Sequence, residues 1–201
     1  MDTILVVDDD PAIREIFTIY LEMEGYRIFA VTDGMACLDQ LKTQIPDLIL
    51  LDMMMEPMDG WETLLAIRSS PAFRDIPVII ITGKEPTHEE ILQNGSLIED
   101  FIIKPVDFKK IAKTLHHVIE RDRALKREIA QMKNSMQDPE LLEEYTRLLR
   151  LVRVINNLAK RHEDRAWNEP FPLKKHEERL QQLHRKLHFP DSLLDSNSKG
   201  G

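Results

Sequence analysis

Side chains that could act on a phosphoryl group follow short apolar runs of this chain. They are Asp8, Asp9, Asp10, Asp52, Thr82 and Lys104. If the runs are neighbouring parallel strands, their carboxyl ends meet at one edge of a sheet, where ligands bind. Carboxylates crowded at such an edge repel one another, and Mg²⁺, which prefers octahedral oxygen ligands, relieves this repulsion.

A magnesium ion, a lysine and a hydroxyl placed around one further carboxylate would form a receptacle for a phosphoryl group. The carboxylate can itself be the nucleophile, which would give an aspartyl phosphate. The spacing of these residues along the chain therefore favours phosphoryl chemistry that depends on a divalent cation.

Five apolar runs would position these side chains. They are Ile4–Val7, Tyr26–Val31, Leu48–Leu51, Val78–Ile81 and Phe101–Ile103. Four of them are unbroken, which is typical of strands covered on both faces, and parallel sheets are covered in this way. The run at Tyr26–Val31 is weaker.

Helical patterns separate the runs. The expected helices are Ile13–Leu21 after Pro11, Met35–Leu41, Trp61–Ile67, and a short one after Thr87, whose partner Glu90 completes a capping box. Strands that alternate with helices predict an α/β fold with a doubly wound, five-stranded parallel sheet.

From Phe108 the pattern changes to heptads. The seam residues are Ile111, Leu115, Val118, Asp122, Leu125, Ile129, Met132 and Met136. This period predicts a supercoil with a partner helix. A second helix is expected to start at Asp138-Pro139-Glu140, with a seam from Leu141 to His162. After a break at Asn168–Pro172, Leu173, Leu180, Leu183 and Leu187 predict a third.

We therefore expect a domain over residues 1–120, a helical or coiled-coil module over 121–189 and a disordered tail over 190–201. The module would fold back on itself as a hairpin or small bundle, or its long helix would pair with a second copy to give a homodimer. Both arrangements cover the apolar stripe that a single amphipathic helix leaves exposed.

Four motifs resemble the receiver domain of two-component response regulators, in correct order and spacing over about residues 2–120. They are VVDDDPAIR at Val6–Arg14, LILLDMMMEPMDG at Leu48–Gly60, IIITG at Ile79–Gly83 and FIIKP at Phe101–Pro105. The resemblance implies a flavodoxin-like receiver fold and a phosphohistidine on a partner kinase or phosphotransfer protein as phosphodonor.

The same resemblance implies a role for each matching residue. Asp52 would be the phosphoacceptor, and Asp9 and Asp52 would ligate Mg²⁺ together with the backbone carbonyl of Met54. Asp8 would act on the metal mainly through water. Lys104 would pair with the phosphoryl oxygens, and Thr82 and Phe101 would be the switch residues. The Lys104–Pro105 peptide bond would be cis.

The chain departs from the family pattern at several positions. Glu56 stands where a proline is common, with Pro57 next, so the loop that carries Met54 differs. Leu97 and Ile98 replace a Gly-Ala pair, which predicts a short or irregular fourth helix. Met54 and Lys84 occupy the positions that tune dephosphorylation.

Simpler interpretations apply to other residues. Asp10 is expected to cap a helix rather than bind metal, and the three methionines after Asp52 are expected to serve in packing. The pair His184 and His188 lacks a third ligand, so we expect no zinc there. No phosphate-binding loop is present, because no glycine stands five residues before Gly83.

Composition narrows the class of protein. Residues 1–107 hold 21 acidic and 7 basic side chains, a net charge of −14, whereas residues 108–201 hold 14 and 20, a net charge of +6. The single Cys37 cannot form an internal disulfide, and no apolar run reaches the roughly 20 residues that span a membrane. We expect a cytoplasmic protein with no membrane association.

The expected function is a phosphorylation-controlled signalling switch that acts through protein contacts or dimerisation and catalyses only its own phosphorylation and dephosphorylation. Basic residues such as Arg121, Arg123 and Lys126 alternate with acidic ones, which is typical of a solvated helix face, so we expect no nucleic-acid partner. The alternatives are a DNA-binding transcriptional regulator and a phosphorelay intermediate without an output of its own.

Overall fold

The computed structural model describes residues 1–132, 139–161, 173–190 and 194. Its contacts divide the chain into two units. The sheet unit comprises Met1–Glu85 and Asp100–Ile119, and the helical unit comprises Pro86–Glu99 and Glu120–Gly201. The short stretch Pro86–Glu99 thus belongs with the C-terminal helices, although both of its ends continue into the sheet unit.

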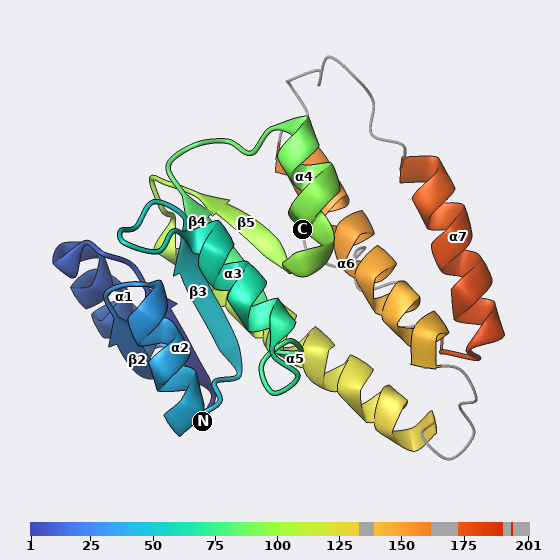
Figure 1. The fold of residues 1–201 in the computed structure, drawn as a ribbon, viewed down its shortest axis with the longest axis horizontal. Coiled ribbons are helices and arrows are strands. Elements are labelled where there is room, and N and C mark those ends of the chain that lie inside the picture. Colours follow the sequence, from blue (N-terminus) through green and yellow to red (C-terminus); the bar gives the residue numbers. More distant parts are fainter. Residues whose placement is uncertain (133–138, 162–172, 191–193, 195–201) are drawn as a thin grey trace. The chain divides into compact units, whose positions relative to one another are not determined.

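The sheet unit contains a five-stranded parallel sheet with the strand order β2-β1-β3-β4-β5 (Figure 1). The strands are β1 Thr3–Val7, β2 Arg27–Val31, β3 Leu48–Asp52, β4 Val78–Thr82 and β5 Asp100–Ile103. Every residue of β1, β3 and β4 is buried, which confirms that unbroken apolarity marks strands covered on both faces. The doubly wound receiver fold expected from the sequence is confirmed.

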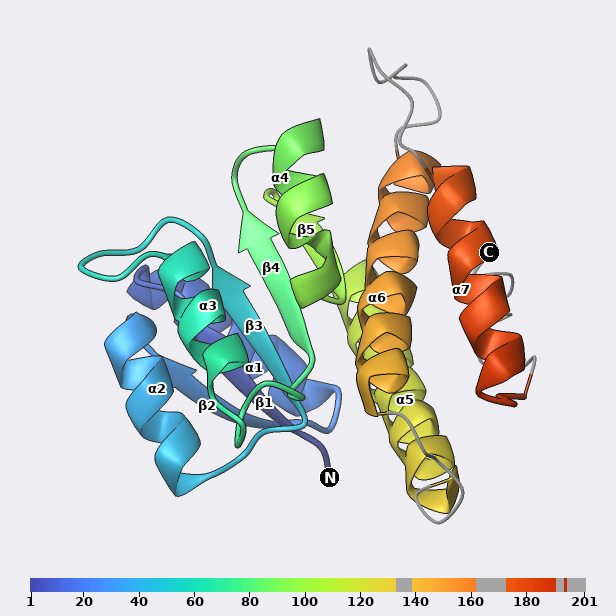
Figure 2. The ribbon, with the colours of Figure 1, turned by 45° about the vertical axis from the view of Figure 1, so that its right-hand side comes forward.

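Helices cover both faces of this sheet. They are α1 Pro11–Met23, α2 Gly34–Thr43, α3 Gly60–Ser69 and the first part of α5 Phe108–Met132. Helices α1 and α5 bury Phe17, Leu21 and Leu115 against one face of the sheet, and α2 and α3 lie side by side on the other (Figures 1 and 2). Cys37 of α2 is fully buried, and its burial raises the pKa of the thiol to about 12.

The helical unit contains α4 His88–Asn94, a 3₁₀ turn at Gly95–Leu97, the end of α5, and helices α6 Pro139–Arg161 and α7 Leu173–Lys186. Helices α6 and α7 pack side by side (Figure 2), and their apolar stripes share one core. Its buried members are Leu125, Tyr145, Leu149, Val152, Leu180, Leu183 and Phe189. Inside this core the Tyr145 hydroxyl and His184 Nδ1 lie 3.0 Å apart.

The start and length of several helices match the prediction. Helix α1 begins at Pro11 and α6 at Pro139, and Thr87 and Glu90 form the expected capping box. Helix α4 has seven residues and ends in the 3₁₀ turn, so the fourth helix is indeed short and irregular.

The heptad interpretation of α5 needs a correction. Ile111, Leu115 and Val118 lie in the core beneath the sheet rather than against a partner helix, because the same spacing also serves a helix that packs on a sheet. Leu125 and Ile129, further along, join the core of the helical unit.

The predictions for Met136, Asp138, His162, the break at 168–172 and nearly all of the tail at 190–201 fall outside the described residues. Within the part of the chain that the structure describes, no helix is both long enough and apolar enough to cross a membrane.

Candidate functional site

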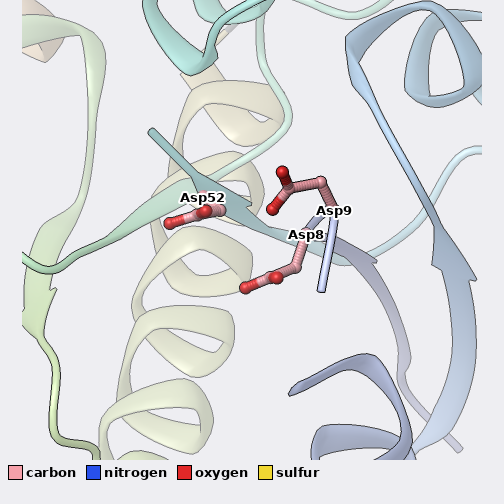
Figure 3. A group of neighbouring side chains, drawn as sticks. All are labelled: Asp8, Asp9 and Asp52. Atoms are coloured by element: carbon pink, nitrogen blue, oxygen red, sulfur yellow. The ribbon is translucent and has the colours of Figure 1, made fainter. Parts of the chain in front are cut away.

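Three carboxylates meet at the carboxyl edge of the sheet. Strands β1 and β3 are paired neighbours with Val7 opposite Leu51, so the residues that follow, Asp8 and Asp52, come side by side. Asp9 extends into the same space (Figure 3), and one ligand oxygen from each of the three lies within 4.8 Å of the others. Among the described residues this is the one group of three or more side chains placed to hold a metal ion.

The three carboxylates differ in exposure. Asp8 and Asp52 are 1% and 3% exposed, whereas Asp9 is open to solvent. The loop that carries Asp8 is held from two sides, because Asp8 Oδ1 accepts a 2.9 Å hydrogen bond from the Asp10 amide and Arg14 donates a 2.7 Å bond to the Asp8 carbonyl. Arg14 was not singled out from the sequence, since nothing in its spacing distinguishes it from a solvated helix residue.

Lys104 supplies the positive charge of the site from the end of β5. Its Nζ lies 3.1 Å from Asp8 Oδ2 and 3.2 Å from Asp52 Oδ1. The Lys104 amide donates to the Thr82 carbonyl, and the following peptide, Lys104–Pro105, is cis as expected. One lysine thus contacts two of the three carboxylates.

Burial and the neighbouring charges shift the pKa values of Asp52 and Lys104. Burial raises the pKa of Asp52, and the charge of Asp8 adds to this, while Lys104 opposes it. Burial by itself would lower the pKa of Lys104, but its hydrogen bond to Asp8 and the charge of Asp52 outweigh this effect and raise it. Lys104 therefore stays charged, and its single ammonium group is shared by the carboxyl groups of Asp8 and Asp52.

The donor chemistry of this cluster fits a hard divalent cation. Three carboxyl groups and one ammonium group give a formal net charge of −2, and carboxylate oxygens are among the ligands that Mg²⁺ takes in proteins. The exposed Asp9 leaves the cluster open to solvent on one side, which suits an ion that keeps several of its waters.

Thr82, the last residue of β4, and Phe101, the second residue of β5, are buried at 6% and 1% exposure. The Thr82 hydroxyl is engaged with its own loop: it donates to the Lys84 carbonyl and accepts from the Lys84 amide, each at 3.1 Å. The ring of Phe101 packs edge-on against Trp61 of α3, with centroids 6.5 Å apart.

The loop after Asp52 is closely packed at its end. The Gly60 amide donates to the Met53 carbonyl, and a Cβ at Gly60 would lie 2.4 Å from the Asp52 carbonyl oxygen. Of the three methionines after Asp52, Met53 and Met55 are buried at 8% and 4% exposure, as expected for packing, whereas the side chain of Met54 is 74% exposed. The expectation that Met54 serves in packing is therefore wrong, and its role through the backbone carbonyl stays a prediction.

The simpler interpretation of Asp10 is confirmed. The Asp10 side chain caps α1 by accepting from the Ala12 amide. His184 is buried, with its Nδ1 3.0 Å from the Tyr145 hydroxyl, whereas His188 is exposed.

The response regulator receiver domain model matches residues 4–116, more than half of the chain. The chain belongs to this family. It is the receiver domain of a two-component response regulator, a signalling domain, followed by helices α6 and α7 beyond the matched residues.

Solved receiver domains share this fold. The N-terminal domain of a response regulator receiver protein from Methanoculleus marisnigri JR1 is 50% identical, with a TM-score of 0.51, and the match covers 59% of this chain and 96% of that one. The receiver domain of the sensor histidine kinase PA1611 from Pseudomonas aeruginosa PAO1 is 28% identical, with a TM-score of 0.54, over 59% of this chain and 98% of that one. That structure has a magnesium ion coordinated in its active-site cleft.

A relative among characterised proteins is the DNA-binding response regulator MtrA of Mycolicibacterium smegmatis. It is 35% identical over 115 residues, which is 55% of this chain and 49% of that protein. The match thus spans about half the length of that relative. The expectation that this chain has no nucleic-acid partner gains no support from this comparison.

Proposed function

We propose that this receiver accepts a phosphoryl group on Asp52 in a site that requires Mg²⁺. The observation that carries the proposal is the position of Lys104 Nζ, 3.1 Å from Asp8 and 3.2 Å from Asp52 inside a cluster of three carboxylates. An ammonium group there can neutralise a phosphoryl oxygen as soon as Asp52 becomes an acyl phosphate.

Each residue would have a definite role in the transfer. A carboxylate oxygen of Asp52 attacks the phosphorus of a phosphohistidine, the new O–P bond forms, and the P–N bond breaks with its electron pair leaving on the imidazole nitrogen. Asp9, Asp52 and the Met54 carbonyl would hold Mg²⁺, and Asp8 would act through water. When bound, the ion supplies positive charge to the carboxylates and phosphoryl oxygens. Thr82 would turn toward the phosphoryl group, with Phe101 changing rotamer.

The donor would be a sensor histidine kinase or a phosphotransfer protein in the cytoplasm, and the output would pass through protein contacts. The packing of the helical unit supports this output, because the apolar stripes of α6 and α7 are buried against each other and Arg121, Arg150 and Arg153 point inward. A second candidate is DNA binding, which the name of the relative MtrA favours. A phosphorelay intermediate is the third.

A magnesium titration with two matched variants tests the proposed site. Asp9→Asn removes a carboxylate from the cluster, and Asp10→Ser removes the neighbouring charge while keeping a residue that caps helices well. We expect calorimetry to show affinity for Mg²⁺ at least tenfold weaker for Asp9→Asn and little changed for Asp10→Ser. Equal losses in the two variants would mean that general charge, and not the cluster, attracts the ion.

A further inference from the structure

The segment Pro86–Glu99 connects two strands that carry site residues, yet it belongs to the helical unit. Thr82 ends β4 shortly before the segment, and Lys104 follows β5 shortly after it. Any force that the C-terminal helices exert on this segment is therefore transmitted through a few residues of chain to both contacts proposed for the phosphoryl group.

Helix α6 packs directly on this segment. The 3₁₀ turn at Gly95–Leu97 and helix α4 both contact α6. The packing is tight at Gly95, where a Cβ would lie 3.0 Å from Leu151 Cδ1 and 3.7 Å from Val154 Cγ1 of α6. Leu151 and Val154 are 7% and 0% exposed.

A buried ion pair reinforces the same contact. Glu99 is 5% exposed, its Oε1 accepts a 2.8 Å hydrogen bond from Arg150 Nε of α6, and its Oε2 lies 3.6 Å from Arg121 of α5. Burial alone would raise the pKa of Glu99, but the charges of Arg150, Arg153 and Arg121 outweigh it and hold the pKa below its ordinary value. Arg121, expected on a solvated face, has a side chain only 14% exposed, because it turns inward to this carboxylate.

We propose that α6 is an internal clamp that holds Pro86–Glu99 in the unphosphorylated conformation and so opposes phosphorylation. This inference rests on the proposed function of Asp52. Its direction follows from Thr82, whose hydroxyl is bonded to both the amide and the carbonyl of Lys84. A Thr82 that turns to a phosphoryl group gives up these bonds, and the loop that leads into Pro86 loses its anchor.

The coupling acts in both directions. If the clamped segment disfavours the phosphorylated state, a phosphoryl group on Asp52 weakens the hold of α6 by the same factor, since linkage is reciprocal. Release would expose the Leu151 and Val154 side of α6 and the surface of Gly95, which is a face that a partner protein can recognise.

Three variants test the clamp in the full chain. Arg150→Ala removes the hydrogen bond to Glu99, and Leu151→Ala removes packing at Gly95 without touching a charge. The control, Arg179→Ala, breaks an Arg–Glu pair between α7 and Glu144 of α6, which is surface-exposed. The probes are amide hydrogen exchange of residues 86–99 and affinity for beryllium fluoride with Mg²⁺, a stable phosphoryl mimic.

We expect faster exchange of residues 86–99 and at least about fivefold tighter binding of beryllium fluoride for Arg150→Ala and Leu151→Ala, and neither change for Arg179→Ala. In the wild type the mimic itself should speed exchange of this segment. If the wild type binds beryllium fluoride and all three variants have the same affinity and the same exchange rates as the wild type, the clamp proposal is wrong and the phosphoacceptor site stands. If the wild type does not bind it, the proposed function fails, and the inhibitory role with it.

Discussion

Asp52 lies among the charged side chains of the site. It is 3% exposed and shares Lys104 with Asp8, so one partly exposed cation faces two buried carboxylates. This arrangement favours ligand binding over stability. Buried carboxylates whose charge is not fully neutralised destabilise the protein until a cation binds to them.

Asp52→Asn should therefore stabilise the metal-free protein. Asparagine has nearly the same shape without the charge, and we expect the free energy of unfolding in EDTA at pH 7 to rise by about 1 kcal/mol or more. Saturating Mg²⁺ should stabilise the wild type and shrink this difference. Urea unfolding with and without the ion measures both effects, and a variant less stable than the wild type in EDTA would contradict the argument.

At the residue scale, the sequence predicted the residues that form the cluster, because each one ends an apolar run and parallel strands end at one edge. Residues that act over long sequence separations were missed. Arg14 reaches back to the Asp8 carbonyl, and Arg150 reaches Glu99 across 51 positions. No local pattern marks such pairs.

Among the elements, α2 and α3 approach closely at Gly34. A Cβ there would lie 2.1 Å from Thr63 Oγ1 and 2.9 Å from Met58 Sδ. Gly34→Ala should destabilise the protein by about 1–3 kcal/mol because it overpacks this contact. Gly83→Ala is the control, since nothing lies within 4 Å of its Cβ position. Thermal unfolding compares the melting temperatures of the two variants. Equal values would show that α2 and α3 move apart at little cost to accommodate the added methyl group.

The ion pair between Glu99 and α6 predicts how the helical unit responds to acid. The folded state lowers the pKa of Glu99, so its ionised form adds stability above the pKa of the unfolded chain, about 4.3, and this stability is lost as the pH falls through the folded value. Glu99→Gln should be less stable than the wild type by about 3 kcal/mol at pH 7.

The difference between Glu99→Gln and the wild type should shrink below about pH 4, where the wild-type carboxyl also becomes neutral. This difference in stability is measured by native-state hydrogen exchange of the α6 amides between pH 5 and 7. Denaturant unfolding measures it at lower pH. If the difference in free energy of unfolding between the two proteins stays constant down to pH 2, the ionised form of Glu99 does not contribute to stability.

Element boundaries were predictable where burial is complete. The runs at β1, β3 and β4 matched within a residue or two, whereas β2, which is partly exposed, gave the weaker signal. The heptads of α5 were ambiguous because Ile111 and Leu125 share one period but belong to the cores of different units.

For the whole molecule, the decisive feature is that the C-terminal helices find their partners within one chain. Helices α6 and α7 bury their stripes in a shared core, and the division of the chain assigns Pro86–Glu99 to the same unit. The sequence left both a hairpin and a homodimer open. Periodicity shows that the apolar stripe of a helix must be covered, but it does not show whether the same chain or a second copy covers it.

The full chain should consequently be a monomer at micromolar concentration in the absence of a phosphoryl group. Light scattering coupled to gel filtration gives the mass directly, and the same measurement with beryllium fluoride and Mg²⁺ shows whether release of α6 creates a dimer. A stable dimer before any ligand is added would contradict the packing of α6 and α7 within one chain.

Labelling of Asp52 tests the account most directly. The full chain is incubated with a small-molecule phosphodonor, with Mg²⁺ or with EDTA, and mass spectrometry of the intact chain and its peptides follows the added phosphoryl group. We predict one phosphoryl group on the peptide that contains Asp52, dependent on Mg²⁺ and absent from Asp52→Asn. Equal labelling of Asp52→Asn, or no labelling of a folded wild type that binds Mg²⁺, would contradict the assignment.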